Sequence, residues 1–323
     1  MQPPTVSDVL DARNLIRCYL PETPTISPPA LADLLGFDIA LKCENMQPIG
    51  AFKVRGGINL VGRLSQEERE RGVVTASTGN HAQSIAYAAR IFGVRTIVYM
   101  PEKNNPNKVA ATRRLGAEVV ETGADFDECR LAAEARARTD NLRYIHSANE
   151  PLLIAGVGTY ALELLEAVPR LDVVFVPVGG GSGVCGTALV VKALRPETRV
   201  IAVQAANMPA VYRAFHERRM LALEGGSTFA EGLATRVTFE LTWKMMQELV
   251  DDVVLVSEDD MRRAMVTLME HAHLVAEGAG AAAFAAAVNL AAELRGKQVG
   301  AIVSGGNVTL DTLRRAVCDD QAW

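Results

Sequence analysis

Short runs of β-branched and other apolar residues recur along the chain, separated by segments with helical periodicity. Because Val and Ile follow one another in these runs instead of alternating with polar residues, the runs predict strands buried on both faces, as in parallel sheets. The predicted strands are residues 38–44, 72–77, 95–100, 117–122, 173–178, 199–204, 252–257 and 298–304. Helical patterns at 81–92, 107–115 and 126–138 lie between several of them. This alternation predicts an α/β fold with a doubly wound, mostly parallel sheet.

The pattern contains no internal repeat, low-complexity tract or linker that marks a clean boundary. With 323 residues the chain fits one large domain or two ordinary ones. A second domain therefore has to be inserted within the first. We expect a large domain built from residues 1–70 and 149–323, and a smaller α/β domain of residues 71–148.

Composition narrows the class of protein. Apolar residues make up 49% of the chain and aromatic residues only 5%, which indicates a core of small and branched aliphatic side chains. A net charge of −5 without basic blocks argues against nucleic acid or an anionic membrane as the partner. No apolar stretch reaches the roughly 18 residues of a membrane span, and the amino terminus is no secretory signal. Five scattered cysteines without a CxxC pair suit a cytoplasmic protein.

The segment PVGGGSGVCGTA (177–188) follows a predicted strand and opens a helix. Backbone N–H groups without side chains at a helix N-terminus form an anion cradle, so a phosphate site is favoured over a merely tight turn. Gly181, Gly183 and Gly186 also form a GxGxxG pattern, which makes a nicotinamide-dependent oxidoreductase an alternative. That fingerprint needs an acidic residue at the end of the next strand, where Gln204 stands instead.

Lys53 follows Phe52 in the segment KCENMQPIGAFKVRGG. Most lysines are solvated surface residues, but the phenylalanine and small residues around this one would desolvate its amine. Desolvation lowers the pKa of a lysine and makes the amine a nucleophile that can form a Schiff base.

Polar side chains also follow two other predicted strands. In TASTGNHAQS, Ser77, Thr78, Asn80 and His81 crowd the start of a helix, where donors converge on a carboxylate, although a Ser or Thr there is often only a helix cap. In VSGGNV, Ser304 can cap the next helix or give a ligand one neutral hydrogen bond. Doubly wound sheets bind ligands at such strand ends, so we expect all four segments to form one site.

In this order the four segments resemble the fold-type II pyridoxal-phosphate enzymes, specifically the threonine/serine dehydratase and serine racemase family. The resemblance spans nearly the whole chain, from LKCENMQPIGAFKVRGG to SGGNV. It implies a tryptophan synthase β-like fold, pyridoxal 5'-phosphate as the cofactor, a small amino acid as the substrate and a homo-oligomer, commonly a dimer.

The resemblance also implies a role for each site residue. Lys53 would carry the cofactor through a Schiff base and act as the catalytic base, with Phe52 on one side of the ring and Gly232 near the other. The remaining cofactor contacts would be Asn80 with the phenolic oxygen, Gly179, Gly180, Gly181, Ser182 and Gly183 with the phosphate, and Ser304 with the pyridine nitrogen. The substrate would contact Ser77, Thr78, Asn80, His81 and, on a weaker match, Arg130.

A serine opposite the pyridine nitrogen cannot hold it protonated as an aspartate would, so the ring is a weaker electron sink. Prompt loss of a β-hydroxyl suits such a site better than transamination. We therefore expect β-elimination of a 3-hydroxy amino acid, by default L-threonine or L-serine, to a 2-oxo acid and ammonia. 3-Hydroxyaspartate and 3-phenylserine stay open as substrates, as do racemisation and a non-catalytic sensor role.

The chain departs from the family's pattern at several positions. The family usually has glycine where Ser182 stands. Racemases have a second base, a serine, where Thr78 stands, and the stiffer threonine puts proton return on the opposite face in doubt. The chain ends shortly after SGGNV, so we expect no regulatory domain of the kind biosynthetic threonine dehydratases carry, and a catabolic or specialised enzyme fits better.

We expect no metal. Gln204 and Ala210 occupy the positions where the racemases have a glutamate and an aspartate as metal ligands. His271 and His273 form an HxH, but side chains two residues apart on a helix diverge.

Overall fold

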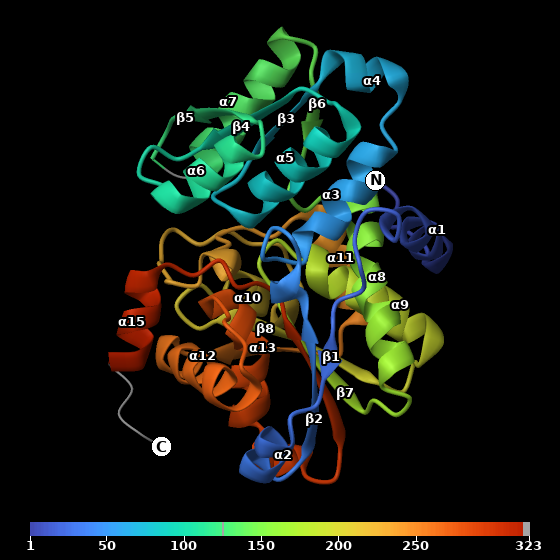
Figure 1. Cartoon of the computed structure of the whole chain (residues 1–323), viewed down its shortest axis with the longest axis vertical. Helices are drawn as coiled ribbons and strands as arrows, with labels where there is room; N and C mark the ends of the chain where they lie inside the picture. Colours follow the sequence, from blue (N-terminus) through green and yellow to red (C-terminus); the bar gives the residue numbers. More distant parts are fainter. Residues whose placement is uncertain (125, 319–323) are drawn as a thin grey trace.

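The computed structural model describes residues 1–124 and 126–318, which form two sheets, one above the other in Figure 1. The larger sheet consists, in spatial order, of β1 (Thr25–Ile26), β2 (Asp38–Cys43), β10 (Gln298–Val303), β7 (Val173–Pro177), β8 (Arg199–Ala205) and β9 (Asp252–Val256). Only β1 is antiparallel to its neighbour in this sheet. The smaller sheet consists of β5 (Glu118–Glu121), β4 (Thr96–Met100), β3 (Val73–Ala76) and β6 (Arg143–Ile145), all parallel.

Helices cover both faces of each sheet. One face of the larger sheet packs against α2 (Pro29–Leu35), α12 (Glu258–Ala272), α13 (Gly278–Asn289) and α15 (Leu310–Cys318). The other face packs against α1 (Val6–Ile16), α8 (Pro151–Ala167), α9 (Ser182–Leu194) and α11 (Glu240–Leu249). The smaller sheet lies between α7 (Phe126–Thr139) on one face and α5 (Asn80–Phe92) with α6 (Pro106–Arg114) on the other.

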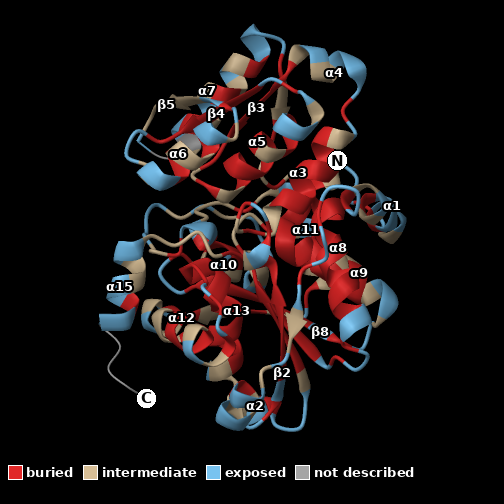
Figure 2. Cartoon of the chain, in the orientation of Figure 1, coloured by how far each residue is buried: buried red, intermediate tan, exposed pale blue. Residues whose placement is uncertain are grey.

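This arrangement confirms the predicted α/β fold with mostly parallel sheets. Because helices cover both faces, the central strands are buried throughout, as Figure 2 shows and as their continuous Val/Ile runs predicted. Each predicted strand lies within one residue of the observed bounds, whereas β1 and β6 were not predicted. The four strands of the smaller sheet come from residues 73–145. The domain boundaries at 70/71 and 148/149 stay a prediction.

The remaining helices are short or connect the two sheets. They are α3 (Lys53–Gly62), α4 (Gln66–Arg71), α10 (Ala210–His216), α14 (Ala291–Leu294) and the 3₁₀ turns η1 (Glu44–Met46) and η2 (Glu231–Leu233). Among the described residues, no helix is both long enough and apolar enough to cross a membrane. The alanine-rich segment that begins at residue 279 forms α13, a buried core helix beneath the larger sheet.

Helix α3 joins the two layers by packing against both α5 and α8. Glycines make the close approach possible: a Cβ on Gly57 would lie 2.4 Å from Ser84 Oγ, and one on Gly156 would lie 2.7 Å from Arg55 O. Since α3 begins at Lys53, this packing holds that residue between the sheets. The carboxyl ends of β2, β7 and β10 meet at one edge because these strands are neighbours in parallel register.

Candidate active site

The loop that carries Lys53 is bonded to the turn after β10. Phe52 N donates to Ser304 O (3.0 Å), and Gly306 N donates to Gly50 O (2.8 Å), flanking a bridge between Ala51 and Gly305. The structure thus brings together two segments from opposite ends of the chain. Ser304 is buried, and its Oγ donates to Ala279 O (3.3 Å).

The amine of Lys53 has no carboxylate partner among the described residues. Its Nζ is 3.2 Å from Ser182 Oγ and 5.0 Å from the centroid of the Phe52 ring. Burial lowers the pKa of Lys53 to about 8, because the charged form loses water and gains no compensating anion. Near neutral pH a sizeable fraction of the amine is therefore unprotonated and can act as a nucleophile or a base.

The glycine cradle, residues 179–183, faces this amine. Gly181 precedes α9 with φ +99°, a conformation that favours glycine, and a Cβ on Gly179 would lie 2.2 Å from Gly232 O. The first intrahelical bond of α9 runs from Cys185 N to Gly181 O (2.9 Å). The N–H groups of the first turn therefore have no helical acceptor and can bind an anion. Gly232 lies against this cradle, and its predicted place beside the cofactor ring stays a prediction.

Two residues that were not predicted hold the cradle in place. Tyr160 Oη donates to Gly183 O (3.0 Å), and Thr187 Oγ1 lies 2.8 Å from Tyr160 Oη. The ring of Phe52 packs edge-on against Tyr160, with centroids 6.0 Å apart. The same tyrosine thus orients both the cradle and the aromatic residue next to Lys53.

Hydrogen bonds determine how the amide of Asn80 points. Its Nδ2 donates to Glu277 Oε1 (2.6 Å), while its Oδ1 accepts from Asn307 Nδ2 (2.8 Å). One N–H of Nδ2 remains for an acceptor on a ligand. Burial raises the pKa of Glu277, and Lys108 and Asn80 oppose that rise. Glu277 was missed, although a lone carboxylate in the segment LVAEGAGAAAF was a visible signal.

His81 is held as a neutral imidazole. Thr75 Oγ1 donates to Ile145 O (2.8 Å), so in its 3.0 Å contact with His81 the Nε2 of the histidine is the donor. Burial, reinforced by the charge of Lys53, places the pKa of His81 well below its usual value. The free Nδ1 is therefore an acceptor. A carboxylate can meet His81 only through its backbone N–H, in the first turn of α5.

Ser77 and Thr78 lie directly before that turn. Ser77 Oγ accepts from Gly79 N (3.1 Å), and Thr78 O accepts from Asn104 Nδ2 (3.0 Å). The first intrahelical bond of α5 is from Gln83 N to Gly79 O (3.1 Å), which leaves the earlier N–H groups of the helix without an intrahelical acceptor. The first turn of α5 therefore has N–H groups that can bind an anion.

Arg130 lies on α7, next to Glu134 and His146. It forms an ion pair with Glu134 (2.7 Å) and lies close enough to His146 to contribute, after burial, to lowering its pKa to about 4. The His146 ring packs against Phe239 with centroids 4.8 Å apart. A Cβ on Gly180 would lie 3.6 Å from the Phe239 ring, so this aromatic pair borders the cradle. His146 and Phe239 were not predicted.

Lys108 connects the two sheets beside the site. This buried residue of α6 pairs with Glu231 of η2 (2.5 Å) and lies 3.9 Å from Glu277 Oε2. Its side chain also covers Gly79, where a Cβ would lie 2.7 Å from Lys108 Cδ. This contact could not be predicted, because Glu231 and Glu277 lie more than a hundred residues from Lys108 along the chain.

Beneath α3 lies a fully buried group of charges. Arg55 bonds Glu44 (2.8 Å) and Glu163 (2.5 Å), and Lys42 also bonds Glu163 (2.5 Å). Two cations face two carboxylates, so the group is neutral overall. Its bonds join β2, η1, α3 and α8, which makes a rigid base for Lys53, two residues from Arg55.

The profile of the family described as "Pyridoxal-phosphate dependent enzyme" matches residues 19–305. The chain belongs to this family. Within this pyridoxal-phosphate family, the L-threonine ammonia-lyase of Thermotoga maritima is 39% identical over 97% of this chain and 78% of its own length. Among solved structures, the processed form of threonine deaminase isoform 2 from Solanum lycopersicum has a TM-score of 0.91 and 31% identity, covering 98% of this chain and 90% of that one. Maize serine racemase has a TM-score of 0.93 and 31% identity, covering 98% of each chain.

The residues of this pyridoxal-phosphate enzyme fit its cofactor. A phosphate needs the unpartnered N–H groups of the cradle, where side chains on Gly179 or Gly181 would collide with backbone or with Thr242. An aldehyde needs an unprotonated amine, which Lys53 provides. The family decides against the nicotinamide alternative, and the third glycine of GxGxxG has a packing role. A Cβ on Gly186 would lie 2.8 Å from Gly158 N, where α9 crosses α8.

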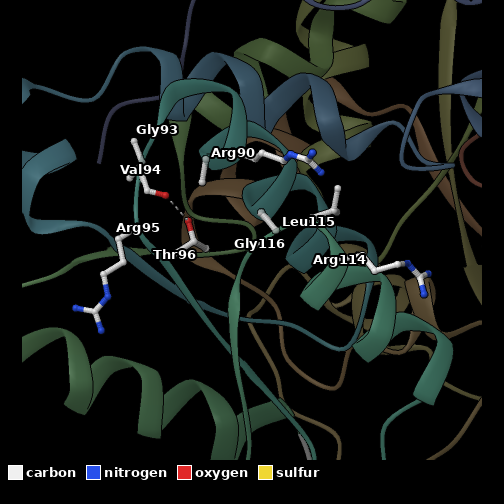
Figure 3. A pocket seen from close by; sticks show the side chains of 10 residues that line it. Arg90, Gly93, Val94, Arg95, Thr96, Arg114, Leu115 and Gly116 are labelled. Carbon is white, nitrogen blue, oxygen red and sulfur yellow. Dashed lines mark hydrogen bonds between the residues drawn. The ribbon is translucent and has the colours of Figure 1, made fainter.

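A cavity of about 400 Å³ lies away from this site, at the amino edge of the smaller sheet. Arg90, Arg95 and Arg114 line it, but their guanidinium groups do not converge in Figure 3, where Arg95 points downward and Arg90 and Arg114 both extend to the right. Arg90 and Arg114 belong to the last turns of α5 and α6, where a cation complements the helix dipole. The cavity has no convergent polar groups and no connection to Lys53.

Gln204 and Ala210 stand at the positions from which we expected no metal, and both have other contacts. Gln204 Oε1 accepts from Val211 N (2.9 Å) and Tyr212 N (3.0 Å), and Ala210 is buried at the start of α10. His273 ends α12 in a left-handed conformation, with φ +56°. In the part of the chain that is described, no three His, Cys, Asp or Glu side chains group as metal ligands would. The expected absence of a metal stays a prediction.

Proposed function

We propose that this pyridoxal-phosphate enzyme is an ammonia-lyase that dehydrates and deaminates a 3-hydroxy amino acid, with L-threonine as the main substrate and L-serine as the second. The observation that carries the proposal is the Lys53 amine, with a pKa of about 8 and no carboxylate partner, directly facing the glycine cradle. Relatives 36–39% identical over most of the chain are named L-threonine ammonia-lyase or dehydratase, which supports threonine as the substrate.

The proposed contacts follow from the geometry. The cradle and Ser182 would hold the phosphate, the free N–H of Asn80 would bond the phenolic oxygen, and the Ser304 hydroxyl would meet the pyridine nitrogen. Phe52 and Gly232 would border the ring. When bound, the cofactor supplies an electron sink that acidifies the Cα–H of the amino acid.

The chain's own residues then perform two tasks. The first turn of α5, with Ser77, Thr78 and the His81 N–H, would bind the substrate carboxylate and so direct the Cα–H toward Lys53. The unprotonated Lys53 amine takes the Cα proton. Burial, with the nearby charge of Lys53, lowers the pKa of His81 and keeps the ring neutral, and Thr75 accepts its N–H. A neutral ring next to Lys53 avoids a second charge that would lower the basicity of the amine further.

Racemisation is the second candidate, because of the similarity to maize serine racemase. It needs a second group that moves a proton on the face opposite Lys53. Thr78 stands where the racemases have a serine as this second base. Its carbonyl is held by Asn104, but no bond to its hydroxyl is present among the described residues. 3-Hydroxyaspartate and 3-phenylserine stay alternatives, and Phe239 and His146, which border the cradle at Gly180, are candidate contacts for a larger substrate side chain.

A panel of L- and D-3-hydroxy amino acids, each assayed for 2-oxo acid and ammonia, tests the proposal. We expect 2-oxobutanoate from L-threonine, pyruvate from L-serine and no D-serine from L-serine. Lys53→Ala should lower kcat by about 10²–10⁴-fold, and Lys297→Ala, at an exposed position, should leave it unchanged. A holoenzyme with bound cofactor that converts none of these amino acids would overturn the proposal in favour of a sensor.

We also propose that the enzyme is a cytoplasmic homodimer. The five cysteines form no disulfide in the described structure, which suits a reducing compartment. Light scattering after gel filtration at several protein concentrations would give the mass in solution, and a monomer at all of them would contradict the dimer.

A further inference from the structure

The Lys53 amine has one polar partner among the described residues, and it is a hydroxyl. Ser182 Oγ lies 3.2 Å from Nζ, and the Ser182 side chain is buried, with 3% of its surface exposed. No other hydrogen bond to that hydroxyl is present among the described residues. Ser182 is the first residue of α9, so its backbone belongs to the glycine cradle while its side chain reaches the amine.

We propose that Ser182 is a positioning residue that holds the free amine of Lys53 at the cradle through the hydrogen bond from Nζ to its hydroxyl. The proposal deepens the proposed function, since it rests on Lys53 being the group that must be unprotonated to act. Among the described residues, no other side chain forms a hydrogen bond with the Lys53 amine. The neighbouring groups are the ring of Phe52 and the neutral ring of His81, and neither accepts a hydrogen bond from the amine in this structure.

Two opposing effects determine the pKa of Lys53. Burial favours the neutral amine and lowers the pKa. A hydrogen bond from Nζ–H to a hydroxyl oxygen is stronger when the nitrogen is charged, so it favours the ammonium form and raises the pKa. Without Ser182, burial acts unopposed, and an amine of lower pKa is a weaker base for removing a proton from carbon.

The Ser182 hydroxyl can accept one hydrogen bond and donate another at the same time. While its oxygen accepts from Nζ, its proton is available to an anion in the cradle. The α9 backbone holds Ser182 Cα, so a short two-bond side chain places Oγ with little conformational freedom. An amine bonded to it stays on the cradle side of Phe52 instead of turning toward solvent.

The test is a titration of Lys53 in the cofactor-free protein, which needs neither substrate nor turnover. The protein is labelled with trace acetic anhydride at a series of pH values from roughly 6 to 11, and mass spectrometry gives the labelled fraction of the Lys53 peptide. Exposed Lys297 in the same digest serves as the internal standard. In the native sequence we expect the midpoint for Lys53 between about 8, the value that burial alone gives, and its usual 10.5.

Ser182→Ala should shift the Lys53 midpoint downward by about 0.5–1 pH unit. Ser182→Cys, which keeps the side-chain shape but is a weak acceptor, should shift it nearly as far. Ser84→Ala is the matched control, because Ser84 Oγ donates to Lys53 O (2.5 Å) and not to the amine. That variant should leave the midpoint in place.

The contrary outcomes are specific. An unchanged or higher midpoint in both Ser182 variants, or an equal shift in Ser84→Ala, would overturn the role of Ser182. Either result leaves the lyase proposal intact if the native holoenzyme converts L-threonine. The opposite combination is an inactive native holoenzyme together with a lower Lys53 midpoint in Ser182→Ala. It would support the contact between Ser182 and Lys53 and contradict the lyase proposal.

Discussion

At the scale of single residues, the site contains ionisable side chains whose pKa values are shifted by burial away from their values in water. Lys53 is a cation whose pKa burial lowers to about 8, and Glu277 is an acid whose pKa burial raises. His81 cannot take up a proton near neutral pH. Each is kept in place by partners on other elements, so the fold as a whole maintains the reactivity of these few side chains.

Lys53 should therefore destabilise the cofactor-free protein. In the unfolded chain its pKa is near 10.5, so between about pH 8 and 10.5 the unfolded state binds more protons, and below pH 8 the penalty is complete. Replacing Lys53 by Met should raise the free energy of unfolding at pH 7 by on the order of 2 kcal/mol, and the gain should disappear as the pH approaches 10.5. Urea unfolding of both proteins at pH 7 and pH 10 measures this, and an equal gain at both pH values would contradict it.

At the scale of elements, the site depends on glycines that let backbone segments approach. Helix α13 crosses the turn after β10 at Gly280, where a Cβ would lie 2.0 Å from Gly305 O. Because that turn is bonded to the Lys53 loop, any movement of α13 is passed to both Ser304 and Lys53.

Gly280→Ala should therefore displace the Ser304 turn. We expect a loss of about 1–3 kcal/mol in the free energy of unfolding, because backbone has to shift to accept the methyl group. Affinity for pyridoxal phosphate should fall with it, as measured by titration of the cofactor-free protein. Gly225→Ala is the control, since no atom lies within 4 Å of its Cβ and its φ is not positive, and a loss of the same size there would refute the argument.

The elements themselves were largely predictable, and the contacts between them were not. Strands such as β7 and β8 could be predicted because parallel strands buried on both faces need continuous apolar runs. β1 has two residues and β6 three, too short for any pattern to indicate. Lys53 and the cradle carry local signals, because glycines and desolvated lysines stand out in a sequence.

The residues missed in the site have no such signal. Lys108 resembles any surface lysine until the fold brings Glu231 within 2.5 Å. Tyr160 lies in the middle of a helix and is a core residue except for the bond of its hydroxyl to Gly183. Their roles arise from long-range contacts, which a single sequence does not contain.

At the scale of the whole molecule, two sheets face one another across the site, and few polar contacts join them. We propose that they correspond to the two predicted domains, residues 71–148 and the remainder. Lys108 with Glu231, and Asn80 with Glu277, are two of the polar contacts beside the site that cross between them in the described structure. Both involve residues next to the carboxyl edges of the sheets.

Lys108→Met should loosen this connection. The carboxylates of Glu231 and Glu277 would lose their cation, and the segment around α6 should open more often. We expect amide hydrogen exchange in residues 101–116 to rise roughly tenfold, equivalent to about 1.4 kcal/mol, as measured by mass spectrometry. Lys103→Met, at an exposed position in the same segment, should have no effect, and equal exchange in both variants would argue against the bridge.

The position of β10 determines when during synthesis the site can form. This strand lies between β2 and β7, so the larger sheet has a gap at its centre until residues 298–303 have left the ribosome. Until then β2 and β7 each present an unpaired edge, and the Lys53 loop lacks its bonds to the turn at 304–306. A nascent chain that has already completed the smaller sheet therefore still cannot retain the cofactor. Pyridoxal phosphate can therefore bind only after β10 has joined the sheet. We expect chains truncated before β10 to bind no cofactor and to be degraded by proteases.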